Sequence, residues 1–352
     1  MQELDALKNM KHGKINYTDK YEQAKDILYA FYDLAVSPAT FDIVKFILMA
    51  EISRKRKNKK QIHIIIVPGM HDGFRNEIPE HNLAESHWRV RNILVGCCNL
   101  LKSCSGFTYC TNRKEAYYYL KNSGESHFPE NYSTDHPIAC YLTPSIKNFI
   151  NNAADWPSLE PPKYAQNIIY SLMKSFGENV KVVTINLRDS STQPSRNSNL
   201  HEWGKVCQYL NENGYKVIVI RDSEKAYSEL PVEYINTYDG REFIWNIPLR
   251  AALYEQTYIN LFVSNGPATL AMHNKDQSRC LIFKMLCEGT SSASSAFFKG
   301  QGIEIGGQHI YAGPYNRIVW EEDKYENIIK KFNKMKKNIF FETRIIEKIR
   351  EL

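Results

Sequence analysis

The sequence predicts an α/β fold in which two Rossmann-like domains face a central cleft. Short apolar runs rich in β-branched residues alternate with helix-length segments along most of the chain, which is the pattern of parallel sheets with right-handed crossovers. The length of 352 residues exceeds one comfortable core, and a stretch rich in Asn and Pro over residues 151–162 reads as a linker. We therefore expect an N-terminal domain over residues 1–155, a C-terminal domain over 156–322, and a C-terminal helix and tail over 323–352.

The N-terminal half begins with two predicted helices. Apolar residues at helical spacing predict helices over 21–34 and 41–53. Residues 62–67, Ile-His-Ile-Ile-Ile-Val, form a continuous apolar run, as strands buried on both faces do. The elements expected after this strand are a helix over 83–101, a strand over 106–110, a helix over 113–121 and a strand over 138–142.

The C-terminal half repeats the alternation. We expect helices over 164–176, 200–213, 247–256 and 268–273. We expect strands over 180–187, 216–220, 232–235, 260–263 and 280–283. A final helix over 323–337 closes the pattern.

Composition excludes several classes of protein. Hydrophobic residues make up 43% of the chain and charged residues 24%, which argues against global disorder. The net charge of +6 is mild for this length, so nucleic-acid binding is not predicted. The eight cysteines are scattered without CxxC spacing, which favours reduced thiols in the cytoplasm and disfavours a zinc site. The longest apolar run, over 41–52, contains charges and is too short to span a bilayer.

The most informative motif is a tight turn between a strand and a helix at residues 258–272. The apolar run ends at Val263, the turn Ser264-Asn265-Gly266-Pro267 follows, and a helix begins. Unpaired backbone N–H groups at such a junction can hold phosphate without a charged side chain. Gly266 permits close approach of a ligand, and Ser264 or Asn265 can cap the helix. The alternative is an ordinary capped turn.

Ligands of doubly wound sheets bind beyond the carboxyl ends of the strands. The residues at these positions in the C-terminal half are Arg188-Asp189, Arg221-Asp222 and Ser264-Asn265-Gly266. Arg188 and Arg196 would add guanidinium donors to a diphosphate held by the turn, together with Thr269. Asp222 or Asn246 would contact the nucleoside. The alternative makes the Arg-Asp pairs plain surface ion pairs.

The loop Gly69-Met-His-Asp-Gly-Phe-Arg75 follows a strand in the N-terminal half. Gly69, Gly73 and Arg75 are the candidates for contact with a second substrate. His71 or Asp72, between the glycines, could accept the proton of an attacking hydroxyl as general base, and the residues do not decide between them. The alternative is a structural turn, because Asp-Gly is a common turn dipeptide.

Several enzyme classes lack their motifs in this sequence. We find no GxxxxGK[ST] loop, no GxGxxG at the start of either domain and no Gly-x-Ser-x-Gly elbow. No Asp-x-Asp stands at a strand end to hold a divalent ion on a diphosphate. Any sugar transfer is therefore expected to run without a metal or a separate cofactor, with the leaving-group charge met by Arg188 and the turn.

These features together resemble the GT-B glycosyltransferases, and most closely their heptosyltransferase-like group. The resemblance covers nearly the whole chain and rests on the two Rossmann-like halves, the turn and the closing helix. The segments 184–188, 196–198, 202–203 and 320–323 are also similar to the nucleotide-sugar domain of transferases among bacterial surface-polysaccharide enzymes. The chain departs from heptosyltransferases after Gly-Pro, where Ala268-Thr269 stands in place of the usual His motif.

The resemblance implies a glycosyltransferase that moves a sugar from a nucleoside-diphosphate sugar to a saccharide or lipid-linked saccharide hydroxyl. The C-terminal half would hold the donor and the N-terminal half the acceptor. A sugar-nucleotide epimerase of the same architecture and a non-catalytic nucleotide-binding protein are the alternatives.

The basic run over 54–60, which begins at Arg54 and ends at Lys60, follows an amphipathic helix. It reads either as a solvated helix end or as a contact for anionic lipid headgroups. On the second reading the protein is peripheral to the inner face of a membrane.

Overall fold

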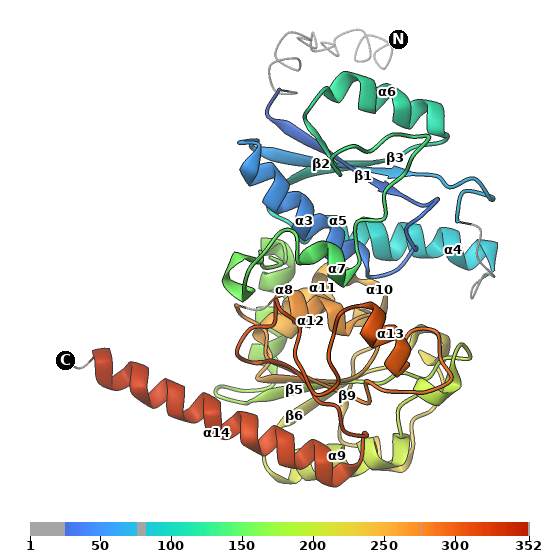
Figure 1. Cartoon of the computed structure of the whole chain (residues 1–352). Helices are drawn as coiled ribbons and strands as arrows, with labels where there is room; N and C mark the ends of the chain where they lie inside the picture. The colour runs from blue at the N-terminus through green and yellow to red at the C-terminus, as the bar shows by residue number, and fades with distance from the viewer. Residues whose placement is uncertain (1–24, 76–81, 275, 351–352) are drawn as a thin grey trace, which may run out of the picture.

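The computed structural model describes residues 25–75, 82–274 and 276–350 and shows two parallel sheets, one above the other in Figure 1. Each sheet has helices on both of its faces. This is the mixed α/β architecture of two Rossmann-like halves that the sequence predicts.

The N-terminal sheet has four strands in the order β3-β2-β1-β4, all parallel. Its strands are β1 (Ile27–Asp33), β2 (Gln61–Val67), β3 (Cys104–Tyr109) and β4 (His127–Phe128). In β1 and β2 the last four residues are buried on both sides of the sheet, which explains their continuous apolar character.

Helices α3 (Ile43–Arg56) and α6 (Arg113–Ser123) lie on opposite faces of this sheet. Asn112 begins α6 because its side chain accepts a hydrogen bond from Glu115 N. A second long helical stretch is formed by α4 (Leu83–Arg89), a π-helical segment (Val90–Leu94) and α5 (Val95–Cys98). The short helix α7 (Thr143–Ile146) follows later in the chain.

The C-terminal sheet has six strands in the order β10-β9-β8-β5-β6-β7, and every pair is parallel. Its strands are β5 (Val182–Asn186), β6 (Lys216–Ile220), β7 (Tyr238–Asp239), β8 (Ile259–Val263), β9 (Cys280–Phe283) and β10 (Asn316–Ile318). All residues of β5, β8 and β9 are buried.

The helices of the C-terminal half divide between the two faces of this sheet. Those toward the N-terminal sheet in Figure 1 are α8 (Lys163–Ser175), α10 (Glu242–Trp245), α11 (Ile247–Gln256), α12 (Ala268–His273) and α13 (Ser295–Gly300). On the far face lie α9 (Leu200–Glu212) and α14 (Tyr325–Arg350), whose far end projects from the body. Asp323 holds this region together because its carboxylate accepts hydrogen bonds from Trp203 Nε1 and Asn199 N.

The two halves contact each other directly. One hydrophobic cluster contains residues of α3 and α5 together with residues of α11 and α12. Trp156, which is 1% exposed, donates a hydrogen bond from Nε1 to Nδ1 of His273 at 2.9 Å. The segment between the halves is therefore packed against α12.

Three predicted elements are wrong. Residues 27–33 of the expected helix 21–34 form β1, a central strand, and residues 21–24 lie outside the described residues. Residues 138–142 form no strand, and the edge position beside β1 belongs to β4. Residues 232–234 form a 3₁₀ turn, and β7 at Tyr238 pairs with β6. Tertiary pairing overrode local propensity in each case.

The final helix begins near the expected residue but continues to Arg350, well beyond 337. Of the helices that the structure describes, none is both long enough and apolar enough to cross a lipid bilayer.

Candidate functional site

A cleft of about 800 Å³ lies between the two halves and is lined from both. The N-terminal wall consists of the loop after β1, the end of the hairpin after β2, and α4 with its π-helical continuation. The C-terminal wall includes the loops after β5, β6 and β8, residues of α10 and α11, and the segment after β9. The cleft therefore lies beyond the carboxyl ends of both parallel sheets, where the sequence predicts it.

The turn that follows β8 lines the cleft through residues 264–269. Asn265 Oδ1 accepts a hydrogen bond from Ala268 N at 3.1 Å, so Asn265 fixes the start of α12. A Cβ atom on Gly266 would lie 2.7 Å from Cδ2 of Phe41, which belongs to the N-terminal wall. Glycine is thus required here by close contact between the two halves.

Arg196 and Arg188 also line the cleft, but their contacts differ. Arg196 donates to the carbonyl of Ser264 at 2.9 Å and to Ser292 Oγ at 2.7 Å, which places its guanidinium beside the turn. Arg188 is 8% exposed and donates to the carbonyls of Thr192 and Gln193 and to Asn197 Oδ1. These bonds show Arg188 holding the loop after β5 in place. Direct contact of Arg188 with a diphosphate stays a prediction.

The predicted nucleoside contacts lie in different places. Asp222 lines the cleft, whereas Asn246 is exposed outside the cleft lining and caps α11 by accepting from Leu249 N at 3.1 Å. Trp245, which the sequence did not single out, lines the cleft and stacks on Tyr227 with ring centroids 5.8 Å apart.

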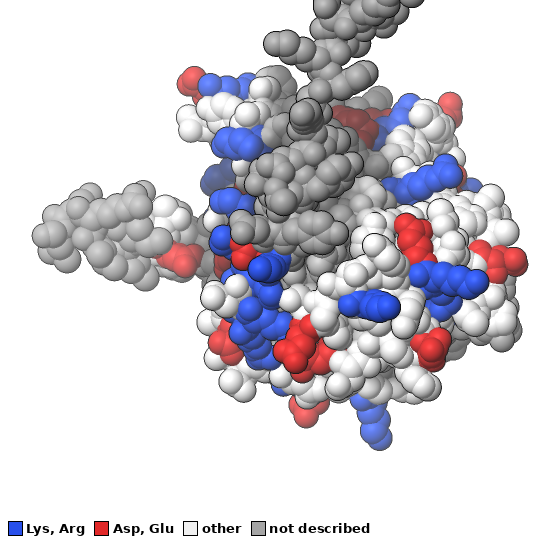
Figure 2. Space-filling view, turned by 90° about the horizontal axis from the view of Figure 1, so that it is seen from above, with Lys and Arg blue, Asp and Glu red and all other residues white. Residues whose placement is uncertain are grey.

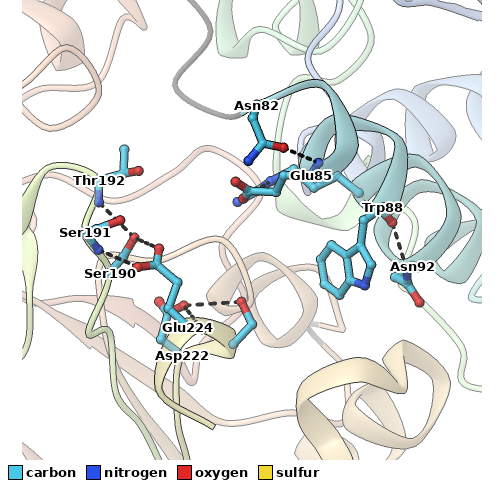
Figure 3. A network of polar contacts seen from close by, with 11 residues as sticks. Asn82, Glu85, Trp88, Asn92, Ser190, Ser191, Thr192, Asp222 and Glu224 are labelled. Atoms are coloured by element: carbon cyan, nitrogen blue, oxygen red, sulfur yellow. Dashed lines mark hydrogen bonds and ion pairs between the residues drawn. The ribbon is translucent and has the colours of Figure 1, made fainter.

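The loop after β5 is braced near Asp222 by Glu224. The Glu224 carboxylate accepts hydrogen bonds from Ser190 Oγ at 2.6 Å and Ser191 N at 2.8 Å. Figure 3 shows this loop across the cleft from α4, where Glu85 and Trp88 extend toward it.

The opposite wall carries a carboxylate at the start of α3. Asp42 lies 2.8 Å from the Lys45 ammonium and accepts a hydrogen bond from Thr40 Oγ1 at 2.8 Å. Burial by itself would raise the pKa of Asp42, but Lys45 and Thr40 outweigh it and lower this pKa below its usual value. Arg75, another cleft residue, donates to Tyr141 Oη at 3.3 Å. The cleft thus contains an ionised carboxylate, that of Asp42, on the wall opposite the turn over residues 264–269.

Two histidines of the cleft are held neutral. His273 is 1% exposed, and burial, with the charge of Lys45, lowers its pKa well below the usual value. The same causes lower the pKa of His309 to about 3. Neither ring is therefore an imidazolium near neutral pH.

The predicted general bases lie away from the turn. Asp72 lines a second hollow of about 640 Å³ on the N-terminal half, together with Gly69 and Gly73. His71 is exposed and lines neither hollow. Gly69 N donates to the Gly73 carbonyl at 2.8 Å, so the segment forms a tight hairpin, and Phe74 at its end packs on His87 of α4. The structure therefore does not bring Asp72 or His71 to the cleft beside Ser264.

Sequence reasoning missed Asp42 for an identifiable reason. Because the apolar spacing predicts a helix that includes residues 27–33, no predicted strand ends before Asp42, and the loop after β1 falls outside the predicted ligand-binding positions. Correct placement of β1 would have marked this loop as a ligand-binding position.

The basic run at the end of α3 contacts both its own helix and residues distant in the sequence. Arg54 donates to both Glu51 carboxylate oxygens at 2.7 Å, and Lys57 Nζ donates to the Glu125 carbonyl at 2.8 Å. Viewed from above, Lys and Arg side chains occur along the edge toward which α14 projects and also on the opposite side, interspersed with Asp and Glu (Figure 2). No cluster of three or more His, Cys, Asp or Glu residues suited to a metal ion occurs in the described ranges.

Comparison with known proteins relies on structure. No protein-family model matches the chain, and no curated protein matches its sequence. The fold is similar to that of a glycosyl transferase family 9 protein from Veillonella parvula, with a TM-score of 0.50 and 10% identity, over 88% of this chain and 97% of that one. It is also similar to ADP-heptose LPS heptosyltransferase II from E. coli, with a TM-score of 0.51 and 7% identity, over 88% and 98% of the chains. The fold is GT-B-like. The expected two-domain architecture is thereby confirmed, and the matches extend over almost the full length of both comparison proteins.

Proposed function

We propose that this protein is a metal-independent glycosyltransferase. It transfers a sugar from a nucleoside-diphosphate sugar to a hydroxyl of a saccharide or lipid-linked saccharide. The observation that carries the proposal is a cleft with an arginine and a main-chain turn on one wall and an ionised carboxylate on the other. The fold shared with a glycosyl transferase family 9 protein supports the same class of reaction.

The two walls of the cleft bind different substrates, the donor on the C-terminal wall and the acceptor on the N-terminal wall. The turn over 264–269 and Arg196 hold the diphosphate, and Asp222 binds the nucleoside near Trp245. The acceptor lies against the N-terminal wall near Arg75. Asp42 takes the proton of the acceptor hydroxyl, and the hydroxyl oxygen bonds to the anomeric carbon. The bond from that carbon to the diphosphate oxygen breaks, and the diphosphate leaves with the electron pair, stabilised by the cationic wall.

Asp42 replaces Asp72 and His71 as the base in this proposal because it lines the cleft and they do not. The proposed nucleoside-binding role passes to Asp222 alone, because Asn246 lies outside the cleft lining.

The test is a panel of nucleoside-diphosphate sugars incubated with saccharide acceptors, with nucleoside diphosphate release and the transferred sugar followed by mass spectrometry. We expect Asp42→Asn to lower turnover about 10² to 10⁴-fold while nucleoside diphosphate affinity stays unchanged, because only proton removal is lost. Asp239→Asn is the matched control, since Asp239 pairs with Arg241 on the surface.

Each other outcome has a distinct meaning. Full turnover by Asp42→Asn, with loss in Asp72→Ala or His71→Ala, would move the base to the hairpin. Conversion of the sugar nucleotide without any acceptor would support the epimerase alternative. Binding without release of the diphosphate would support the non-catalytic alternative.

We also propose, on the residues of the basic run, that the protein contacts anionic lipid headgroups from the cytoplasmic side. Lys55 and Lys60 have side chains that are 62% and 77% exposed and support this role.

A further inference from the structure

Arg250 is a deeply buried cation that the sequence did not single out. It lies on α11, is 4% exposed and contributes to the lining of the cleft. Its Nε donates to Tyr254 Oη at 2.6 Å and its Nη2 donates to Asn186 Oδ1 at 3.3 Å. Both partners are neutral, because burial raises the pKa of Tyr254 to about 12. No carboxylate of the described residues lies within 4.0 Å of this guanidinium.

Two other arginines with little exposure, Arg113 and Arg221, have acidic partners. Arg113 pairs with Asp33 at 2.8 Å, and Arg221 lies 3.6 Å from Asp189. A buried charge without a partner is costly, and arginine cannot escape the cost by losing its proton. An uncompensated arginine at a cleft is therefore typical of a site where the ligand supplies the negative charge.

The surroundings of Arg250 also place and orient this charge. Asn186 ends β5 and pairs in register with Phe262 of β8, and the turn at Ser264 follows two residues after Phe262. Arg250 therefore lies at the same sheet edge as the turn. Two hydrogen bonds from Nε and Nη2 fix the plane of the guanidinium, while Nη1 makes no hydrogen bond with the described residues.

We propose that Arg250 binds a phosphate oxygen of the donor's diphosphate, as an additional cationic contact beside Arg196 and the turn. This assignment rests on the proposed function and makes it more specific. The arrangement gives the C-terminal wall a buried, oriented charge that meets the diphosphate in a desolvated setting, where an ionic hydrogen bond is strongest.

The test compares Arg250→Met with the wild-type protein. Methionine keeps most of the length without the charge, and the hydrogen bond from Tyr254 Oη to Asn186 Oδ1 remains. Binding of ADP, GDP, UDP and CDP, and of the four matching nucleosides, is measured by calorimetry. We expect the affinity for the preferred nucleoside diphosphate to fall about 10- to 100-fold, as for loss of one charged hydrogen bond, and nucleoside affinity to stay unchanged.

The protein without ligand gives a second readout. Removal of an uncompensated charge should leave its melting temperature unchanged or higher, whereas loss of a structural hydrogen bond would lower it. Arg250→Lys keeps a positive charge but lacks the planar guanidinium group with its several fixed N–H donors, so this variant should bind nucleoside diphosphate with intermediate affinity. Arg241→Met, at a side chain that is 42% exposed, is the matched control and should bind like the wild type.

The outcomes separate the two proposals. Wild-type protein that binds no nucleoside diphosphate would contradict the proposed function and this assignment together. Wild-type binding that Arg250→Met or Arg250→Lys retains in full would overturn the role of Arg250 alone. Equal loss of nucleoside and nucleoside diphosphate affinity, with a lower melting temperature, would assign Arg250 a structural role and also overturn it.

Discussion

The contact between Gly266 and Phe41 joins the two walls of the cleft, and we predict that Gly266→Ala disrupts it. The added Cβ would lie 2.7 Å from Phe41 Cδ2, whereas carbon atoms pack about 3.5 to 4.0 Å apart. The ring must therefore move by about 1 Å or the two walls must separate. Because Phe41 directly precedes Asp42, this movement also displaces the proposed base.

The magnitude follows from overpacking. Insertion of a methyl group into a filled contact costs about 1 to 3 kcal/mol, and each kcal/mol lowers the melting temperature by about 2 to 4 °C for domains of 150 to 250 residues. The backbone at Gly266 has no positive φ, so alanine adds no conformational strain and the contact alone sets the cost.

The assay is a double-mutant cycle with Phe41→Ala, measured by thermal and urea unfolding. We expect Gly266→Ala to be destabilising in the wild-type background and much less so when Phe41 is alanine, with a coupling energy of about 0.5 to 3 kcal/mol. Gly300→Ala is the matched control, because a Cβ atom at Gly300 would meet nothing within 4 Å and the φ of this residue is not positive.

Equal destabilisation by Gly266→Ala in both backgrounds would refute the reasoning, because the cost would then not come from Phe41. No destabilisation in either background would refute it as well, since the two walls would not be in contact at this point.

Two further predictions concern pH and lipid. The pKa of His273 is lowered in the folded protein, so as pH falls below about 6.5 the unfolded chain binds a proton that the folded protein does not. The free energy of unfolding therefore decreases by up to about 1.4 kcal/mol per pH unit. Urea unfolding at pH 7 and pH 5 should show a smaller decrease in this free energy for His273→Gln than for wild type, and an identical decrease would contradict the buried neutral state. Wild-type protein should sediment with phosphatidylserine vesicles but not with phosphatidylcholine vesicles. The double variant Lys55→Glu, Lys60→Glu should lose this binding, because each basic residue near an anionic surface contributes about 1 kcal/mol of binding free energy. Absence of wild-type binding would contradict the lipid contact.

Most of the fold could be predicted from periodicity. The run over 62–67 is continuous and apolar because β2 is buried on both faces, and the strands at 216–220, 259–263 and 280–283 follow the same rule. The turn after Val263 was also visible, because Gly-Pro between a strand and a helix marks a defined backbone geometry.

The assignments that failed lack such a local signal. The segment over 27–33 contains Leu, Tyr, Ala and Phe, which suit a helix or a strand, and only its pairing with β2 on one side and β4 on the other makes it a central strand. The short strands β4 and β7 have two residues each, too few to produce a periodic pattern.

By itself, the sequence determined the class of fold, the alternation of buried strands and helices, and the turn at Ser264, because these depend on neighbouring residues. Only the tertiary structure decided which side chains share the cleft. It brought Asp42 and Arg196 to facing walls, set Asp72 beside a separate hollow, and left Arg250 buried without a carboxylate among the described residues. These facts depend on the packing of segments far apart in the chain, and local pattern carries no information about such packing.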